Sequence, residues 1–149
     1  MIQIHLPDAA ATDALGRRLA AHRPAPAVVH LHGDLGAGKS TLARALLRGL
    51  GVTGTVRSPT YTLVERYPLA DGSEAWHLDL YRIGDPGELD FLGLDEGAAS
   101  LWLVEWPERG GDALPPVDLH VHLAIEGDGR SVRLEASSPA GRQWLAALA

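Results

Sequence analysis

Hydrophobic residues recur along the first half of the chain with two different periods. Residues 2–6 alternate between apolar and polar side chains, and residues 27–33 form a short apolar run with β-branched members, so both stretches predict strands. Between them, Asp8 is placed to cap a helix that extends to about His22 with its apolar residues on one stripe. Residues 39–50 carry apolar side chains at helical spacing, which predicts a second helix.

The second half of the chain is richer in strand patterns. Pro86 is well placed to start a helix between two of the strands, and residues 127–130 give a hairpin signal between the last two. Residues 141–149 predict a short closing helix. The predicted strands are residues 60–67, 74–82, 101–108, 117–126 and 131–137.

The first buried run leads directly into GDLGAGKS at residues 33–40, which satisfies the pattern G-x-x-x-x-G-K-[ST] in full. A strand before it and a helix after it are the context in which the backbone N–H groups of a glycine-rich loop surround phosphate oxygens. Lys39 should reach the β- and γ-phosphates, Ser40 should supply a hydroxyl ligand to Mg²⁺, and Thr41 can contact the α-phosphate. The predicted nucleotide-binding residues are Gly33, Asp34, Leu35, Gly36, Ala37, Gly38, Lys39, Ser40 and Thr41.

These patterns together predict the fold class. The length is that of one ordinary domain, so we expect a single domain over residues 1–149. Strands alternate with helices early and a hairpin comes late. This order predicts an α/β phosphate-loop NTPase fold, a three-layer sandwich with a mixed, largely parallel central sheet and a C-terminal hairpin.

Composition narrows the partners and the compartment. The net charge is −6 at pH 7 and the arginines are scattered, which argues against strong binding of nucleic acid by this chain alone. No apolar run reaches the roughly 18 residues of a membrane span and no signal-peptide pattern is present, so we expect a cytoplasmic protein without a membrane partner. The chain has no cysteine and a single lysine, Lys39. An arginine-favouring composition explains the scarcity, yet a compact ammonium suits a crowded phosphate pocket better than a planar guanidinium.

A phosphate loop of this kind needs an acidic residue at the end of a neighbouring strand to help hold the metal. Glu105 closes the apolar run LWLVE, and Asp79 closes WHLD. We favour Glu105 as the metal ligand beside Ser40, which leaves Asp79 for the metal's water shell or the attacking water. The alternative is a strand-end carboxylate that faces solvent. Trp106 follows Glu105 directly and is a candidate contact for a nucleotide or a partner.

The segment 57–62 is a candidate γ-phosphate sensor. It follows the loop helix, as switch segments do in other phosphate-loop proteins, and offers three hydroxyls beside Pro59. Thr60 is its central hydroxyl and a candidate catalytic residue together with Lys39, Asp79 and Glu105. An ordinary hydroxyl-rich loop would carry the same residues.

Two histidine pairs stand at i, i+2 spacing. His30 and His32 share one face of the buried strand, and His120 and His122 share one face of a late strand. Such pairs can bind metal, but the sequence shows no third ligand of matched spacing. We therefore favour packing or surface roles for all four.

Four blocks of the sequence, taken in order, resemble a known family. HGDLGAGKST, SPTYTLVE, HLDLYR and LVEWPERG are similar to the blocks of the TsaE family of bacterial tRNA threonylcarbamoyladenosine biosynthesis ATPases. The resemblance covers about residues 5–135, and the four blocks together are far more specific than the phosphate loop alone.

The resemblance implies a small ATPase that binds ATP and Mg²⁺ and works with a threonylcarbamoyl-transferase subunit and its scaffold paralogue. That complex modifies the adenosine beside the anticodon, so this chain would meet tRNA only through its partners. The ATPase of the family does not transfer the group, and its ATP turnover is thought to sustain repeated cycles of the transferase. The family's metal ligands fall on Ser40 and Glu105.

Two other functions are compatible with a phosphate loop. A small-molecule kinase would need an acceptor pocket and usually an arginine-rich lid, for which RIGDPGELDF at residues 82–91 is a poor match. A nucleotide-dependent regulatory module would bind the nucleotide and scarcely hydrolyse it.

Overall fold

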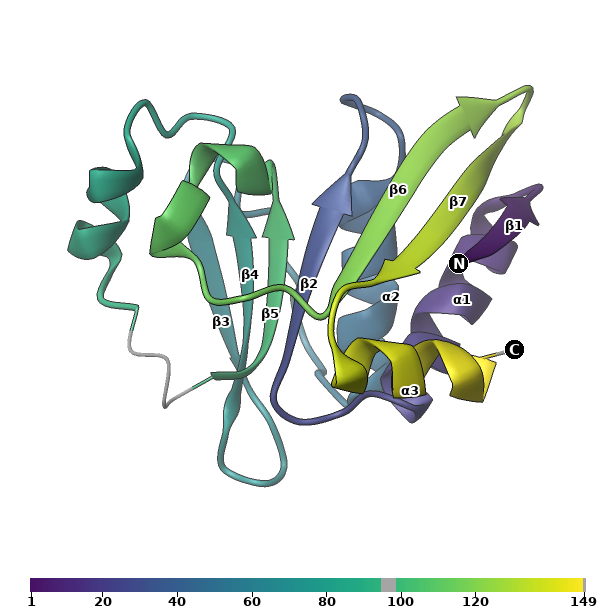
Figure 1. The fold of residues 1–149 in the computed structure, drawn as a ribbon, viewed down its shortest axis with the longest axis horizontal. Coiled ribbons are helices and arrows are strands. Elements are labelled where there is room, and N and C mark those ends of the chain that lie inside the picture. Colours follow the sequence, from purple (N-terminus) through teal and green to yellow (C-terminus); the bar gives the residue numbers. More distant parts are fainter. Residues whose placement is uncertain (95–98, 149) are drawn as a thin grey trace.

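The structure is a computed structural model that describes residues 1–94 and 99–148. Within these residues the chain forms one seven-stranded sheet flanked by helices (Figure 1). Ala149, the last residue of the predicted closing helix, lies outside the described residues. The strands are β1 (Ile2–Leu6), β2 (Ala27–His32), β3 (Val64–Pro68), β4 (Glu74–Asp79), β5 (Ala99–Glu105), β6 (Leu119–Glu126) and β7 (Gly129–Ala136).

The sheet is parallel at its centre and antiparallel at both margins. Its strand order is β1-β7-β6-β2-β5-β4-β3. Strand β2 pairs in parallel with β5 and β6, and β4 pairs in parallel with β5. The other pairings, including the β6–β7 hairpin, are antiparallel. The mixed sheet and the C-terminal hairpin confirm the predicted fold, and the C-terminal ends of β2, β4, β5 and β6 meet at one edge.

One predicted strand begins later than expected. Residues 60–63 form a turn that a hydrogen bond from Leu63 N to Pro59 O closes at 2.8 Å, and β3 begins only at Val64. The next contact ties this turn to the sheet, because Asp79 N donates to Leu63 O at 3.0 Å. The hydroxyl-rich segment is therefore a turn anchored beside the end of β4.

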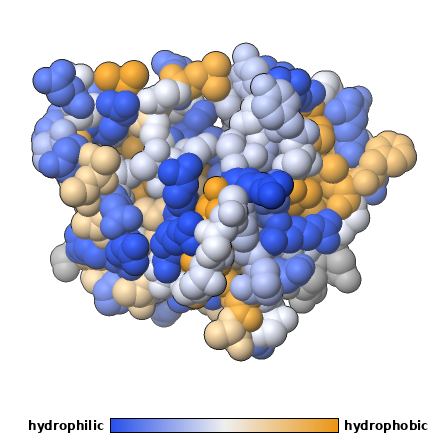
Figure 2. Space-filling model, turned by 180° about the vertical axis from the view of Figure 1, so that it is seen from behind, coloured by the Kyte–Doolittle hydropathy of each residue, from blue (hydrophilic) through white to orange (hydrophobic). Residues whose placement is uncertain are grey.

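The α-helices pack against the sheet face that holds the larger core. Helices α1 (Ala9–Ala21) and α2 (Lys39–Gly49) lie side by side behind the sheet in Figure 1, and Asp8 caps α1 as predicted, accepting from Ala11 N at 2.9 Å. Helix α3 (Pro139–Leu148) is fixed to α1 by Trp144, whose Nε1 donates to Leu19 O at 3.1 Å. Figure 2 shows that the outer surface on this side is largely hydrophilic, with hydrophobic residues in small groups. No helix among the described residues is both long and apolar enough to cross a membrane.

The third layer lies on the sheet face opposite α1 and α2, and its helices are of the 3₁₀ type. They are η1 (Pro86–Leu92), η3 (Pro107–Arg109) and η4 (Gly111–Ala113), so the helix predicted to start at Pro86 is of the 3₁₀ type. Beneath them, Trp76 and Trp102 pack with their rings inclined at 58° and their centroids 5.0 Å apart, in a second core that also holds Leu89. Together with Trp144, these tryptophans are buried.

Close approach of α1 and α2 gives a test of this packing. A Cβ added at Gly16 would lie 2.4 Å from Ala45 Cβ and 2.9 Å from Leu46 N. We predict that Gly16→Ala lowers the free energy of unfolding by about 1–2 kcal/mol, because the cost of overpacking exceeds the gain in helix propensity. Denaturant unfolding monitored by circular dichroism measures this change.

The matched control is Gly84→Ala. Its Cβ would meet only Glu88 Oε1, at 3.6 Å, which is an ordinary contact. We expect a change within about 0.5 kcal/mol for this exposed position. Equal stability of the two variants would mean that α1 and α2 are not held at the observed separation.

Candidate phosphate-binding site

The glycine-rich loop joins the C-terminal end of β2 to the start of α2. Gly33 has φ 149°, and a Cβ at this position would lie 2.6 Å from Leu123 O of β6, so the loop begins with a close approach that only glycine allows. Ala37 N donates to Asp34 O at 3.0 Å and turns the chain back toward the helix. The free N–H groups of the first turn of α2 therefore face the loop, an arrangement that favours anions.

Lys39 folds back over its own loop. Its Nζ donates to Gly33 O at 2.5 Å and lies 3.9 Å from the ring centroid of Trp106. Burial lowers the pKa of Lys39, and the nearby carboxylates, led by Glu105 and then Asp79, oppose that effect. The ammonium is thus poorly solvated and paired with weak partners, which suits it to bind a stronger anion.

Two acidic residues lie next to the loop at the same edge of the sheet. The β4–β5 register pairs Asp79 with Glu105, and both side chains are buried. Ser40, in the first turn of α2, donates its Oγ proton to Glu105 Oε2 at 3.1 Å. A hydroxyl and a carboxylate oxygen thus lie within hydrogen-bond distance beside the phosphate loop.

His77 is a site residue that sequence reasoning missed. Its Nε2 lies 2.6 Å from Glu105 Oε2, and its side chain is 2% exposed. The signal was present, because His77 stands two positions before Asp79 and strand alternation places both on one face. This contact reaches the same carboxylate oxygen that accepts from Ser40, so it helps to fix the orientation of Glu105.

The hydroxyl-rich turn touches the second acidic residue. Thr60 Oγ1 donates to Asp79 Oδ2 at 3.4 Å and lies 2.8 Å from Ser58 Oγ. The other carboxylate oxygen of Asp79 accepts from Tyr81 N at 3.0 Å. The structure therefore brings Thr60 together with Asp79, and Ser40 together with Glu105, beside the loop.

These side chains surround a pocket of about 240 Å³. Among the predicted loop residues, Ala37 lines neither this pocket nor the neighbouring one, because its side chain is buried in the core. Gly33 and Asp34 line a neighbouring pocket with Lys39 and Trp106. The main pocket is lined by Leu35, Gly36, Gly38, Lys39, Ser40, Thr41, Thr60, Asp79, Glu105, Trp106 and Arg130.

Arg130 is the second residue that the sequence did not reveal. It belongs to β7, and its Nη2 donates to Gly36 O at 3.1 Å. An adjoining pocket shares Gly38, Thr41 and Arg130 with the main one and extends to Asp8 and Thr12 near the start of α1. Only the pairing of the β6–β7 hairpin with β2 brings this arginine to the loop, so no local signal could indicate it.

The arrangement combines two chemical capacities. Loop and helix N–H groups with one ammonium can hold phosphate oxygens, and the Ser40 hydroxyl with the Glu105 carboxylate offers the oxygen ligands that a hard cation such as Mg²⁺ prefers. Asp79 and Thr60 form a separate acceptor and hydroxyl pair beside them. The residues present therefore fit a metal-bound phosphate ester.

The fold and the loop together define an α/β protein of the phosphate-loop NTPase class. Residues 6–133 match the family described as "Threonylcarbamoyl adenosine biosynthesis protein TsaE", and the chain belongs to this family. The resemblance seen in the four sequence blocks is confirmed.

Relatives and a solved structure agree with this assignment. The Haemophilus influenzae "tRNA threonylcarbamoyladenosine biosynthesis protein TsaE" is 44% identical over 128 residues, covering 85% of this chain and 80% of its own length. The protein of the same name from Streptomyces coelicolor is 39% identical over 138 residues, covering 89% and 93%. The crystal structure of Bacillus subtilis YdiB superposes with a TM-score of 0.78 at 29% identity, covering 99% of this chain and 93% of that one.

Substitutions can distinguish the roles of the two acidic residues. We predict that Ser40→Ala and Glu105→Gln each weaken Mg²⁺ binding in the presence of ADP by about tenfold or more, since loss of a ligand should cost no less than loss of an outer-shell partner. Asp79→Asn should retain most of the Mg²⁺ affinity. Titration calorimetry measures all three. Loss of Mg²⁺ binding in Asp79→Asn with a silent Glu105→Gln would reverse the two assignments.

Proposed function

We propose that this chain is the ATP-binding, Mg²⁺-dependent ATPase subunit of the bacterial complex that installs threonylcarbamoyl on the adenosine next to the tRNA anticodon. The observation that carries the proposal is that Ser40 and Glu105 meet beside the phosphate loop, with 3.1 Å between Ser40 Oγ and Glu105 Oε2. The chain belongs to a family named for threonylcarbamoyl adenosine biosynthesis, which supports a role of the proposed ATPase in that process.

Each group around the loop has a proposed task. The N–H groups of residues 33–41 bind the phosphates, and Lys39 exchanges Gly33 O for the β- and γ-phosphate oxygens. Thr41 contacts the α-phosphate. Ser40 and Glu105 hold Mg²⁺, which when bound offsets the phosphate charge.

Asp79 and Thr60 are proposed to orient the attacking water. Asp79 is buried and already accepts from Tyr81 N, so its position is fixed while one oxygen stays directed at Thr60. A carboxylate held beside the metal side of the pocket can accept a hydrogen bond from water, and Thr60 can sense the γ-phosphate through its hydroxyl.

The nucleoside is proposed to lie in the adjoining pocket. This pocket continues from Gly38 and Thr41 toward Asp8 and Thr12, so it begins where the α-phosphate would end. Arg130 lines both pockets and can place its guanidinium near the α-phosphate or the ribose.

The partners are proposed from chemistry and family together. A net charge of −6 gives the chain little attraction for tRNA phosphates, which supports contact with tRNA through a threonylcarbamoyl-transferase subunit and its scaffold paralogue. Such a complex would work in the cytoplasm, where its tRNA substrate is found.

We predict that Lys39→Ala lowers ATP turnover by at least about 100-fold while the fold remains intact, because the ammonium stabilises charge on the transferred phosphoryl group. The ammonium donates to Gly33 O of its own loop rather than to the core, so its removal should leave the fold intact. Phosphate release from labelled ATP measures turnover, with the transferase and scaffold subunits present and absent.

The matched control is Arg44→Ala, which removes an exposed cation from the same helix. It should leave turnover unchanged. Unaltered turnover in Lys39→Ala would remove the phosphate-loop assignment. Label that leaves ATP only when a small-molecule acceptor is added would favour a kinase instead.

The turn at residues 57–64 gives a second prediction. Its hydroxyls reach the Asp79 carboxylate through a 3.4 Å hydrogen bond from Thr60 Oγ1, so a γ-phosphate should add contacts that order the turn. We predict slower hydrogen exchange in residues 57–64 with a non-hydrolysable ATP analogue than with ADP, and no difference in the buried strand β5. Equal protection in both states would leave these hydroxyls as ordinary loop residues. By linkage, a partner that recognises the ordered turn must tighten ATP binding by the same factor.

A further inference from the structure

Four histidines meet on the sheet face opposite α1 and α2. The parallel register pairs His30 of β2 with His120 of β6, and His32 with His122. Val29 and Leu31 point into the helix-side core, so strand alternation directs His30 and His32 to the other face. The third ligand that spacing along the chain did not show is therefore supplied by the neighbouring strand.

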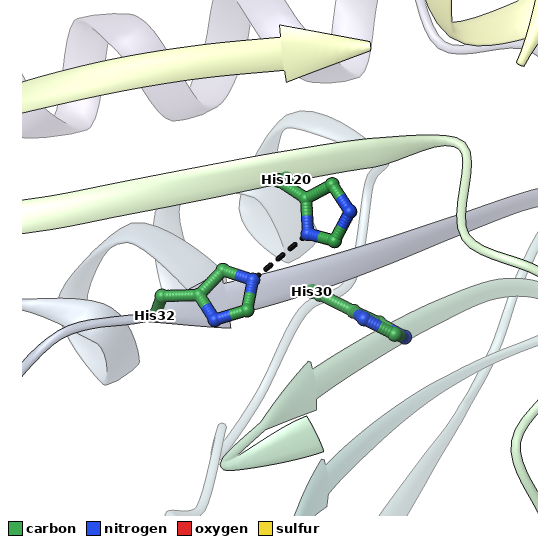
Figure 3. Close-up of side chains that lie close together, drawn as sticks. All are labelled: His30, His32 and His120. Carbon is green, nitrogen blue, oxygen red and sulfur yellow. Dashed lines mark hydrogen bonds between the residues drawn. The ribbon is translucent and has the colours of Figure 1, made fainter. Parts of the chain in front are cut away.

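Three of the rings are close enough to bind one metal ion together. Figure 3 shows His30 and His32 extending from β2 and His120 from the adjacent β6, with the rings of His32 and His120 joined by a hydrogen bond. That bond measures 2.9 Å between His32 Nε2 and His120 Nδ1. One ring nitrogen from each of the three histidines lies within 4.8 Å of the other two.

The surroundings bury these rings and, within the described part of the chain, leave two ring nitrogens of the group without partners. Burial, with repulsion from neighbouring imidazoles, lowers the pKa of His30 and of His32 to about 4. Burial likewise lowers the pKa of His122, whose ring stacks on His32 at 4.6 Å. Among the described residues, Nε2 of His30 and Nε2 of His122 are buried and have no hydrogen-bond partner. Neutral imidazole with a free nitrogen is the form that binds metal.

We propose that His30, His32 and His120 form a binding site for a divalent transition metal of the Zn²⁺ type. Zinc takes imidazole nitrogens at about 2.0–2.1 Å in tetrahedral geometry, so its ligand nitrogens stand about 3.3 Å apart. The His32–His120 pair is already near that separation, and a ring nitrogen of His30 lies within 4.8 Å of both. The fourth position is left for water or for the ring of His122.

This site is distinct from the proposed Mg²⁺ site. Ser40 and Glu105 offer oxygen donors on the helix side of the sheet, whereas the histidines offer only nitrogen donors on the other face. Nitrogen donors suit zinc, cobalt, nickel and copper, and oxygen donors suit magnesium. Binding at the histidines therefore needs no nucleotide and does not depend on the proposed ATPase function.

The test is a Co²⁺ titration of the full chain, without a polyhistidine tag and without nucleotide, followed by visible absorption. We expect one equivalent to give the intense absorption bands of tetrahedral cobalt, and Zn²⁺ to displace them. His30→Gln and His120→Gln should each weaken binding by about tenfold or more, as loss of a ligand requires. The control variants His22→Gln, at an exposed position after α1, and Ser40→Ala should bind like the parent chain.

A second measurement on the parent chain covers the case in which a histidine variant does not fold. Zn²⁺ should shift the imidazole ¹⁵N resonances of His30, His32 and His120 and leave those of His5 and His22 unchanged. Weak octahedral absorption, equal affinity in the ligand variants and the parent, or Zn²⁺-insensitive resonances of the three rings would each overturn the proposal.

Discussion

The parallel pairing of β2 with β5 and of β5 with β4 is the constraint on which the site depends. Parallel strands bring their carboxyl ends to one edge, and here the register sets Leu31 opposite Glu105 and Glu105 opposite Asp79. The phosphate loop leaves β2 at that edge, so the helix that follows it places Ser40 within 3.1 Å of the Glu105 carboxylate. A shift by one residue would turn Glu105 and Asp79 to the opposite face. The buried apolar residues of these strands fix the register, and the register fixes the positions of Glu105 and Asp79 beside the loop.

Much of this edge could be predicted because its signals are local. The glycine spacing with Lys39 is a string of adjacent residues, and the two acidic residues stand at the ends of apolar runs. Contacts that depend on register could not be read in this way. Arg130 reaches the loop only because the β6–β7 hairpin pairs beside β2, and His120 meets His30 for the same reason. The late start of β3 depends on a turn closed by Pro59 O, which β propensity alone does not capture.

The sheet separates two kinds of donor. On the helix side, oxygen atoms of Ser40 and Glu105 lie beside a loop suited to phosphate. On the other face, no α-helix among the described residues covers β2 and β6, and imidazoles occupy the space that apolar side chains fill elsewhere in the sheet. His32 directly precedes Gly33, so the histidine cluster and the phosphate loop are adjacent along the chain. Because the pKa of His32 is lowered to about 4, this ring adds no positive charge beside Lys39 at neutral pH.

The proposed function requires this chain to bind ATP within a tRNA-modifying assembly, and formation of that assembly can be measured. The chain would be mixed with the transferase and scaffold subunits of the same organism and passed over a sizing column with a non-hydrolysable ATP analogue, with ADP, or with no nucleotide. We expect a three-subunit complex with the ATP analogue and weaker association with ADP. The absence of any complex in all three conditions would contradict the proposed function.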